Sequence, residues 1–155
     1  MIRTLTLSPL LRFLACVAAL FAFALPAAQA QQMVSVDRDV INLRTGPGTE
    51  HEAVWRLNRG YPLMVISRKG DWLQVRDFEN DSGWVLASLT ARKPHFVTKA
   101  QDVNLRAGPG TNHKAVAKIQ YGEVLKSLEQ RGSWARVSTP SGETGWIARS
   151  LLWGW

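Results

Sequence analysis

The sequence predicts an all-β protein in which one small fold is built twice in tandem. When the sequence is displaced by 62 residues, 34–89 align with 96–151 without a gap, and 19 of the 56 aligned pairs are identical. Inside each copy, short apolar runs alternate with turn residues such as Gly60, Gly70 and 80–83. A turn signal about every ten residues is typical of a small barrel or sandwich. The only helix-like stretches outside the N-terminal segment follow each Gly-Trp pair, and each is long enough for one 3₁₀ turn.

Residues 1–30 have the pattern of a secretory signal peptide. Arg3 and Arg12 provide positive charge, the apolar run 13–25 follows, and Ala28-Gln29-Ala30 offers an A-x-A cleavage site after Ala30. The apolar run has thirteen residues, whereas a membrane-spanning helix needs roughly twenty. We therefore expect a protein that is exported to the periplasm or cell envelope of a bacterium and has no stable membrane span after cleavage.

The cysteine and histidine content argues against cysteine chemistry and metal binding. The single cysteine, Cys16, lies in the predicted signal peptide, so the exported part would have neither thiol nor disulfide. This excludes a cysteine nucleophile and a cysteine-based zinc site. His51 lies between two glutamates, but its counterpart His113 does not, and no spacing suits a set of three or four zinc ligands. We expect no metal and no cofactor.

The repeat sets the expected domains, and the two copies differ in charge. The predicted boundaries are 1–30 for the signal peptide, 33–89 for the first domain, 90–95 for the linker and 96–155 for the second domain. The first copy has a net charge of −1 and the second copy +4. One interpretation is an ordinary solvated surface. The other is that the second copy favours anionic partners. Nucleic acid is not an expected partner, because we expect the chain to be exported and it has no basic-aromatic RNA motif.

A glycine-rich stretch occurs at the same place in both copies, as NLRTGPGT at 42–49 and NLRAGPGT at 104–111. It is neither a dinucleotide fingerprint nor a P-loop, because the third glycine, the Gly-Lys pair and the following helix are absent. We interpret it as a chain corner after the first inward strand, in which the glycines adopt backbone angles that a side chain would forbid. The predicted structural residues of this corner are Gly46, Pro47, Gly48, Gly108, Pro109 and Gly110.

Arg44 and Arg106 lie in this repeated stretch, and two roles are open for them. Each guanidinium could fork onto carbonyl or carboxylate oxygens and hold the loop in place. Alternatively, each could face an anionic ligand.

The tryptophans provide the other ligand-binding candidates. In the runs 72–76 and 134–138, the aliphatic residues alternate with Trp72 and Trp134, so these two indoles point away from the core if the aliphatic face is buried. We expect each to contact a ligand, to be partly covered by the long loop, or both. Trp55 occurs only in the first copy, where its counterpart is Ala117, and we take it as a further candidate.

Three other aromatic residues complete the set. Tyr61 is a ligand-binding candidate because it too occurs only in the first copy, where its counterpart is Glu123. Trp84 and Trp146 follow a turn glycine and precede a β-branched residue. We expect these two to be structural and to close the barrel or hold the final turn.

Together these motifs resemble the bacterial SH3-like (Src homology 3) domain. Each copy has NLRxGPGT near its start, GYPL or GEVL in its middle, then GDW or GSW, and finally GWV or GWI. The resemblance covers nearly all of the exported chain, twice. It implies two exported β-barrels of five to six strands that serve as recognition modules, often for cell-wall peptidoglycan or its peptides. Many members of the family lie beside a hydrolase.

These observations predict a non-enzymatic binding protein, because no nucleophile or acid–base pair repeats between the copies. The expected partner is cell-wall peptidoglycan or its peptides. The alternative is an adaptor in the periplasm that binds a peptide segment of another envelope protein, and a cell-wall enzyme is the third possibility. The oligomeric state does not follow from the sequence.

Overall fold

The structure is a computed structural model that describes residues 32–155. The predicted signal peptide, residues 1–30, lies outside the described residues. No helix in the described part is long and apolar enough to cross a membrane. The regular elements there are β-strands and two single 3₁₀ turns, Ala87–Leu89 and Arg149–Leu151, so the prediction of an all-β fold is confirmed. Both 3₁₀ turns follow the Gly-Trp pairs, as the sequence predicts.

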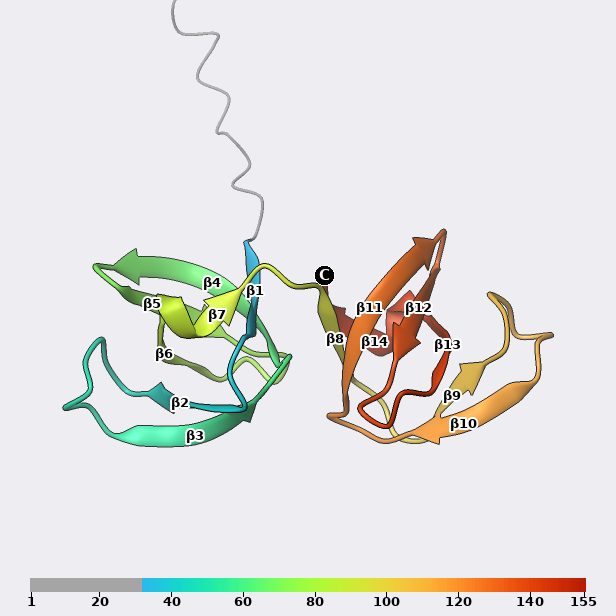
Figure 1. The fold of residues 1–155 in the computed structure, drawn as a ribbon, viewed down its shortest axis with the longest axis horizontal. Coiled ribbons are helices and arrows are strands. Elements are labelled where there is room, and N and C mark those ends of the chain that lie inside the picture. The colour runs from blue at the N-terminus through green and yellow to red at the C-terminus, as the bar shows by residue number, and fades with distance from the viewer. Residues whose placement is uncertain (1–31) are drawn as a thin grey trace, which may run out of the picture. The chain divides into compact units, whose positions relative to one another are not determined.

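The first half folds into a sheet of seven antiparallel strands (Figure 1). Along the sheet the strands lie in the order β3-β2-β6-β5-β4-β1-β7. Their bounds are β1 Met33–Val36, β2 Val40–Arg44, β3 Ala53–Asn58, β4 Pro62–Lys69, β5 Trp72–Arg76, β6 Ser82–Leu86 and β7 Thr90–Ala91.

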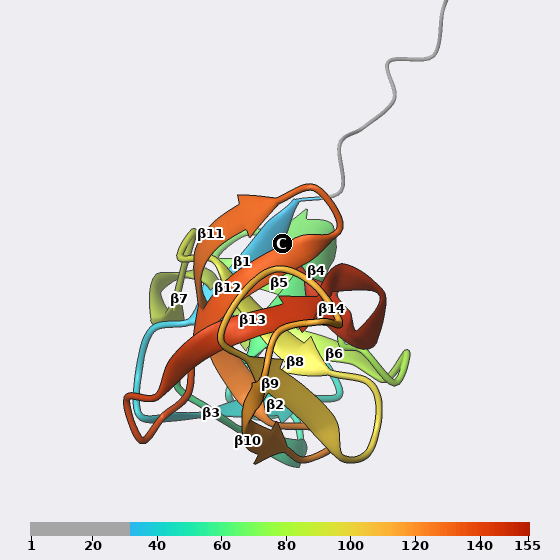
Figure 2. The ribbon, with the colours of Figure 1, turned by 90° about the vertical axis from the view of Figure 1, so that its right-hand side faces the viewer.

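The second half repeats this topology with the order β10-β9-β13-β12-β11-β8-β14. Figure 2 shows β11, β12 and β13 running side by side, in agreement with their ladder pairing. The bounds are β8 His95–Thr98, β9 Val103–Arg106, β10 Ala115–Ile119, β11 Val124–Arg131, β12 Trp134–Ser138, β13 Thr144–Ala148 and β14 Leu152–Gly154.

Each half has its own core, and the two cores use equivalent positions. The first consists of Val34, Val36, Ile41, Leu43, Leu57, Leu63, Leu73, Val75 and Val85. The second consists of Phe96, Val103, Leu105, Ile119, Leu125, Ala135, Val137, Ile147 and Leu152. Eight of the nine positions in the first core recur in the second at the 62-residue offset. The exception is Val36, whose counterpart Thr98 is also buried and whose Oγ1 donates to the carbonyl of Gln120. The duplication therefore extends to the packing.

The sequence places the central strands more accurately than the outer ones. The predicted run 72–76 is β5 and the run 134–138 is β12, residue for residue. Of the predicted linker, residues 90–95, Thr90 and Ala91 pair with β1 as β7, and His95 begins β8. Each sheet has seven strands, not the five or six that the resemblance implies, because such short pairings at the sheet ends add strands.

Candidate functional site

The repeated glycine loop connects β2 to β3 and β9 to β10. Its glycines are required for a reason that differs from the prediction, because neither Gly46 nor Gly108 has a positive φ angle. A Cβ at Gly46 would instead lie 2.6 Å from the His51 ring, and a Cβ at Gly108 would lie 2.6 Å from the His113 ring. The expectation of forbidden backbone angles is thus corrected: glycine is needed because the histidine ring packs directly against the backbone.

Arg44 and Arg106 hold this loop by the same two contacts. The Arg44 Nη1 donates to the Thr49 carbonyl at 3.1 Å and to the His51 carbonyl at 2.7 Å. In the second copy, Arg106 Nη1 donates to the carbonyls of Thr111 and His113 at 3.1 and 2.8 Å. A charged donor shared between two carbonyls fixes the loop against the end of the preceding strand.

Trp72 and Trp134 lie on the outer face of their sheets. Leu73 and Val75, which alternate with Trp72 on β5, are buried in the core, and the Trp72 indole is half-buried on the other face. Trp72 pairs with Leu86 of β6, and Trp134 pairs with Ala148 of β13. Because β6 lies between β5 and β2 in the sheet, the outer face of β6 lies between Trp72 and β2.

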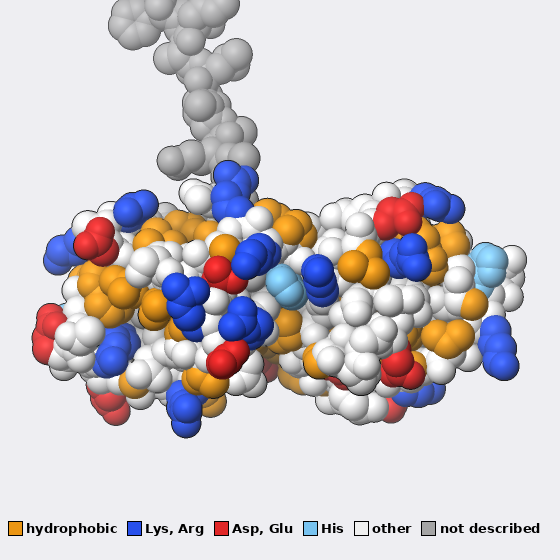
Figure 3. Space-filling model, viewed as in Figure 1, with side chains coloured by type: hydrophobic (Ala, Val, Ile, Leu, Met, Phe, Trp, Pro, Cys, Tyr) orange, Lys and Arg blue, Asp and Glu red, His pale blue; other side chains and the backbone are white. Residues whose placement is uncertain are grey.

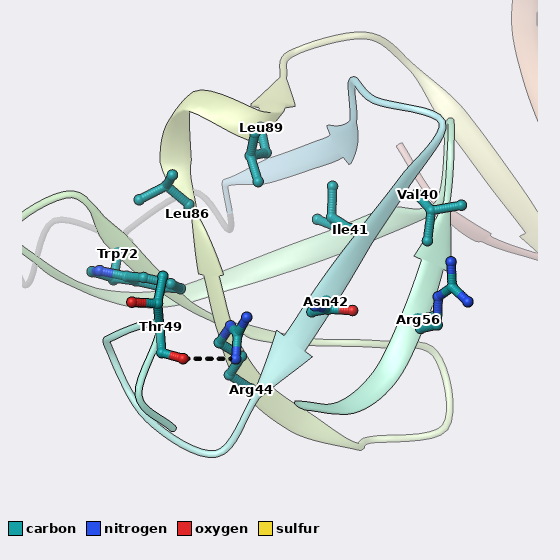
Figure 4. A pocket seen from close by; sticks show the side chains of 9 residues that line it. All are labelled: Val40, Ile41, Asn42, Arg44, Thr49, Arg56, Trp72, Leu86 and Leu89. Carbon is teal, nitrogen blue, oxygen red and sulfur yellow. Dashed lines mark hydrogen bonds between the residues drawn. The ribbon is translucent and has the colours of Figure 1, made fainter. Parts of the chain in front are cut away.

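A cleft of about 330 Å³ opens on this outer face of the first domain. Figure 4 shows Trp72 at one end and Arg56 at the other, with Arg44 and Asn42 between them. The lining residues come from β2, β3, β5, β6, the glycine loop and the 3₁₀ turn: Val40, Ile41, Asn42, Arg44, Thr49, Arg56, Trp72, Leu86 and Leu89. The cleft thus combines an aromatic surface, an aliphatic wall and several hydrogen-bond donors.

The second domain has a cleft of about 200 Å³ at the same place. Eight lining positions coincide with those of the first cleft at the 62-residue offset, and at five of them the residue is identical. The lining residues are Ala100, Gln101, Asp102, Val103, Asn104, Arg106, Thr111, Trp134, Ala148 and Leu151. A surface feature that recurs together with its side chains is a stronger candidate for a site than either cleft alone.

The structure separates the six predicted ligand-binding residues into two groups. Trp72 and Arg44 line the first cleft, and Trp134 and Arg106 line the second. Trp55 lies on the edge strand β3, 58% exposed, and does not line the cleft.

Tyr61 also lies outside the cleft and packs against the first core. Its hydroxyl donates to Asp77 Oδ2 at 3.3 Å. Burial and the neighbouring Asp77 carboxylate raise the pKa of the Tyr61 phenol. The observed contacts of Tyr61 are those of a residue that holds the domain together.

Trp84 lies on β6 where this strand pairs with β2, and Trp146 lies on β13 where this strand pairs with β9. In each case a single residue pair joins the two strands: Trp84 with Arg44, and Trp146 with Arg106. Trp146 is buried, and the Arg131 guanidinium lies over its ring at 5.1 Å from the centroid. Trp84 and Trp146 thus lie where the β2–β3 and β9–β10 hairpins join the rest of their sheets.

Sequence reasoning did not single out two polar residues that line both clefts. They are Asn42, whose counterpart is Asn104, and Thr49, whose counterpart is Thr111. The repeat offers a signal for both, because each is identical in the two copies. Asn42 also alternates with the buried Ile41 and Leu43, which indicates that it points outward.

An acidic cluster lies away from the clefts, at the turn between β5 and β6. Asp77, Glu79 and Asp81 place carboxylate oxygens within 4.8 Å of one another. Asp77 Oδ1 accepts the backbone N–H groups of Glu79 and Asp81, each at 2.9 Å. These bonds account for Asp77 as the residue that closes the turn.

Comparison with known families identifies the repeated fold. Residues 37–91 and residues 101–152 each match a family described as bacterial SH3 domain. The chain carries two bacterial SH3 domains in tandem. The clefts lie at equivalent places in these two SH3 domains, and both Trp-Arg pairs fall within the matched residues.

Relatives of the SH3 domains include proteins named as cell-wall enzymes. YrvJ of Bacillus subtilis, named as an N-acetylmuramoyl-L-alanine amidase, is 25% identical over 137 residues, which cover 81% of this chain and 26% of YrvJ. LytH of Staphylococcus epidermidis, named as a cell wall amidase, is 34% identical over 53 residues, which cover 34% of this chain and 18% of LytH. The chain thus spans about a quarter or less of the length of these relatives.

Among solved structures, an NlpC/P60 family protein from Bacillus cereus is similar to this chain, with a TM-score of 0.37 and 16% sequence identity. The match covers 79% of this chain and 56% of the Bacillus cereus chain.

The names of the relatives correct one expectation. The prediction that this protein is not an enzyme is contradicted, because YrvJ and LytH are both named as amidases. The prediction depended on a search for repeated catalytic residues, and such a search cannot detect an association between SH3 domains and a hydrolase.

Proposed function

We propose that the two SH3 domains bind cell-wall peptidoglycan or its peptides through the repeated clefts, and that this binding serves peptidoglycan hydrolysis in the cell envelope. The observation that carries the proposal is the recurrence of one cleft with the same tryptophan, arginine, asparagine and threonine in both domains.

The chemistry of the cleft suits a short peptide with attached sugar. The Trp72 indole offers a flat apolar surface on which the C–H groups of a sugar or an alanine can lie. Asn42 and Thr49 can exchange hydrogen bonds with amide groups of a peptide. The Arg44 guanidinium offers a charged donor for a carbonyl or carboxylate oxygen. Peptidoglycan contains sugar rings, alanine side chains, amide groups and carboxylates, so it offers a partner for each of these side chains.

The named activities of the relatives suggest how binding would be used. Hydrolysis of an N-acetylmuramoyl-L-alanine bond takes place on an insoluble polymer, where the rate depends on how long the enzyme stays at the surface. Domains that hold the polymer raise the local concentration of cleavable bonds, which is an effective-concentration effect and needs no contact with the bond itself. This use is consistent with the predicted export of the chain.

The test is co-sedimentation with purified sacculi. We expect the wild-type chain to pellet with sacculi, and we expect Trp72→Ala combined with Trp134→Ala to reduce the bound fraction by about tenfold or more, because the aromatic surface of both clefts is lost. Trp55→Ala is the matched control, since it removes an exposed tryptophan outside the cleft.

Two further results of the same experiment decide between alternatives. Equal pelleting of the double variant and wild type would exclude the clefts as the binding site. A chain that ignores sacculi but is recovered cross-linked to a single envelope polypeptide would identify it as an adaptor. The supernatant should also be assayed for soluble muropeptides, alone and with an added amidase, since the proposal expects the wild-type chain to increase their release more than the double variant.

A further inference from the structure

The two clefts differ in charge although they share their position and most of their side chains. The first is lined by two guanidinium groups, those of Arg44 and Arg56, and by no carboxylate. The second is lined by the Arg106 guanidinium and by the carboxylate of Asp102, which stands where the first has Val40. The clefts therefore carry formal charges of about +2 and 0. This order is opposite to that of the whole domains, in which the second copy is the more basic.

The difference depends on where one cation points. Arg56 lies opposite Asn42 in the β2–β3 ladder, and Lys118 lies opposite Asn104 in the β9–β10 ladder, so both start from the same place. Arg56 lines the first cleft, whereas Lys118 does not line the second.

The loop before β9 contains Asp102, which contacts the Lys118 side chain outside the second cleft. Asp102 has a φ angle of 51°, and its backbone carbonyl lies 3.5 Å from the Lys118 ammonium nitrogen. The Asp102 carboxylate accepts a hydrogen bond from Gln120 Nε2 at 3.4 Å. The first domain has Val40 of strand β2 in place of Asp102. Within residues 32–155, Arg56 forms no ion pair with a carboxylate. The Arg56 guanidinium is therefore available to a ligand in the first cleft.

We infer that the first cleft selects peptide segments that carry a carboxylate, and that the second cleft takes uncharged segments of similar shape. This inference rests on the proposed function. Trp72 would lie under the apolar part of the segment, and the carboxylate would lie toward Arg56 at the other end of the cleft (Figure 4). In the second cleft the Asp102 carboxylate would repel the same anion. Arg56 and Val40 in the first domain, and Asp102 in the second, are thus the residues that determine specificity.

The test uses N-acetylated trialanine as the free acid and as the C-terminal amide, two probes that differ by a single negative charge. Binding to the chain with both domains is followed by NMR through the indole N–H signals of Trp72 and Trp134, so each cleft reports separately. We expect the Trp72 signal to show about fivefold tighter binding of the acid than of the amide, which corresponds to one partly exposed ion pair. The Trp134 signal should not prefer the acid.

Three variants make the result specific. Arg56→Gln should abolish the preference at Trp72, and Val40→Asp should do the same while leaving Arg56 in place. Lys118→Gln is the matched control and should leave the response of Trp134 unchanged. Equal preference for the acid at both tryptophans, no preference at Trp72, or no response of Trp72 to either probe would overturn the inference. A different result would contradict the proposed function itself: sacculus binding that does not depend on Trp72 and Trp134.

Discussion

Arg44 combines two roles that look like alternatives when the sequence is considered alone. Its Nη1 atom donates to the carbonyls of Thr49 and His51, and the same side chain lines the first cleft. The loop that Arg44 holds also supplies Thr49 to the cleft. Any ligand that contacts Arg44 therefore meets a guanidinium whose position is already fixed by the fold, which lowers the entropic cost of binding.

This arrangement predicts a stability effect for Arg44→Met. The variant keeps the aliphatic stem but removes both hydrogen bonds to the loop carbonyls, so we expect the free energy of unfolding to fall by about 1.5 kcal/mol. Urea denaturation measures this change, and amide hydrogen exchange should become faster in residues 45–52. Arg56→Met is the matched control in the same cleft and should leave both measurements nearly unchanged. Equal effects of the two variants would argue against the pinning role.

Asp77 predicts a pH dependence of stability. Burial raises the pKa of its carboxyl above the ordinary value of 3.8, against the backbone N–H donors of Asp81 and Glu79, which lower it. A group whose pKa is raised on folding binds its proton more tightly in the folded state. The stabilisation that protonated Asp77 gives to the folded state is therefore fully present below pH 3.8, and it is lost as the pH rises through the pKa of the folded state.

Asp77→Asn keeps an oxygen acceptor for the turn but cannot ionise. We expect the free energy of unfolding of the wild type, relative to this variant, to decrease as the pH rises from about 3 to about 7. Urea denaturation over this range measures the difference. A wild-type advantage that increases with pH would show that the hydrogen bonds to the ionised carboxylate outweigh its burial.

At the scale of elements, the close approach of β6 to its neighbour β2 depends on a glycine. A Cβ at Gly83 would lie 2.6 Å from Leu43 Cγ and 2.8 Å from the Arg44 carbonyl oxygen. The corresponding distances for Gly145 in the second domain are also 2.6 and 2.8 Å, to Leu105 and Arg106. These glycines let the strand that bears Trp84 or Trp146 approach the strand that bears the cleft arginine.

We therefore predict that Gly83→Ala and Gly145→Ala each lower the free energy of unfolding by about 2 kcal/mol, because backbone and core side chains must move apart. Thermal and urea denaturation of the two variants should give similar losses. Ser82→Ala and Thr144→Ala change exposed neighbours on the same strands and serve as controls. A loss confined to one domain would mean that the two close strand contacts are not energetically equivalent.

The sequence predicts the strands of this fold better than it predicts the clefts. Alternation of buried and outward residues gives β5 and β12 residue for residue, and the repeated Trp72 and Arg44 are identified as candidates. Their proximity does not follow from the sequence, because the cleft is formed by strands that are neighbours only through the order β3-β2-β6-β5. Trp55 and Tyr61 are equally good candidates by composition, and only the three-dimensional structure places them outside the cleft.

At the scale of the whole molecule, charge must be assigned to surfaces before it is interpreted. The net charges of −1 and +4 for the two copies suggest that the second prefers anions. Acidic and basic side chains are interspersed on the face shown in Figure 3, so on this face charges of both signs lie on solvated surface. The clefts have the opposite order, and it is their charge that a bound segment would meet.

Two clefts on one chain also predict avidity on a polymer. If each domain binds a different segment of the same sacculus, the second binding event occurs at an effective concentration set by the first, and retention exceeds that of either cleft by roughly 10² to 10⁴. Removal of one cleft by Trp72→Ala should then reduce retention on immobilised sacculi by at least about tenfold. The same variant should leave the binding of a soluble peptide to the second cleft unchanged, as measured by the Trp134 indole signal. Trp134→Ala should give the reciprocal result. A loss of only half the retention in each single variant would mean that the domains bind independently, since two unlinked sites contribute additively.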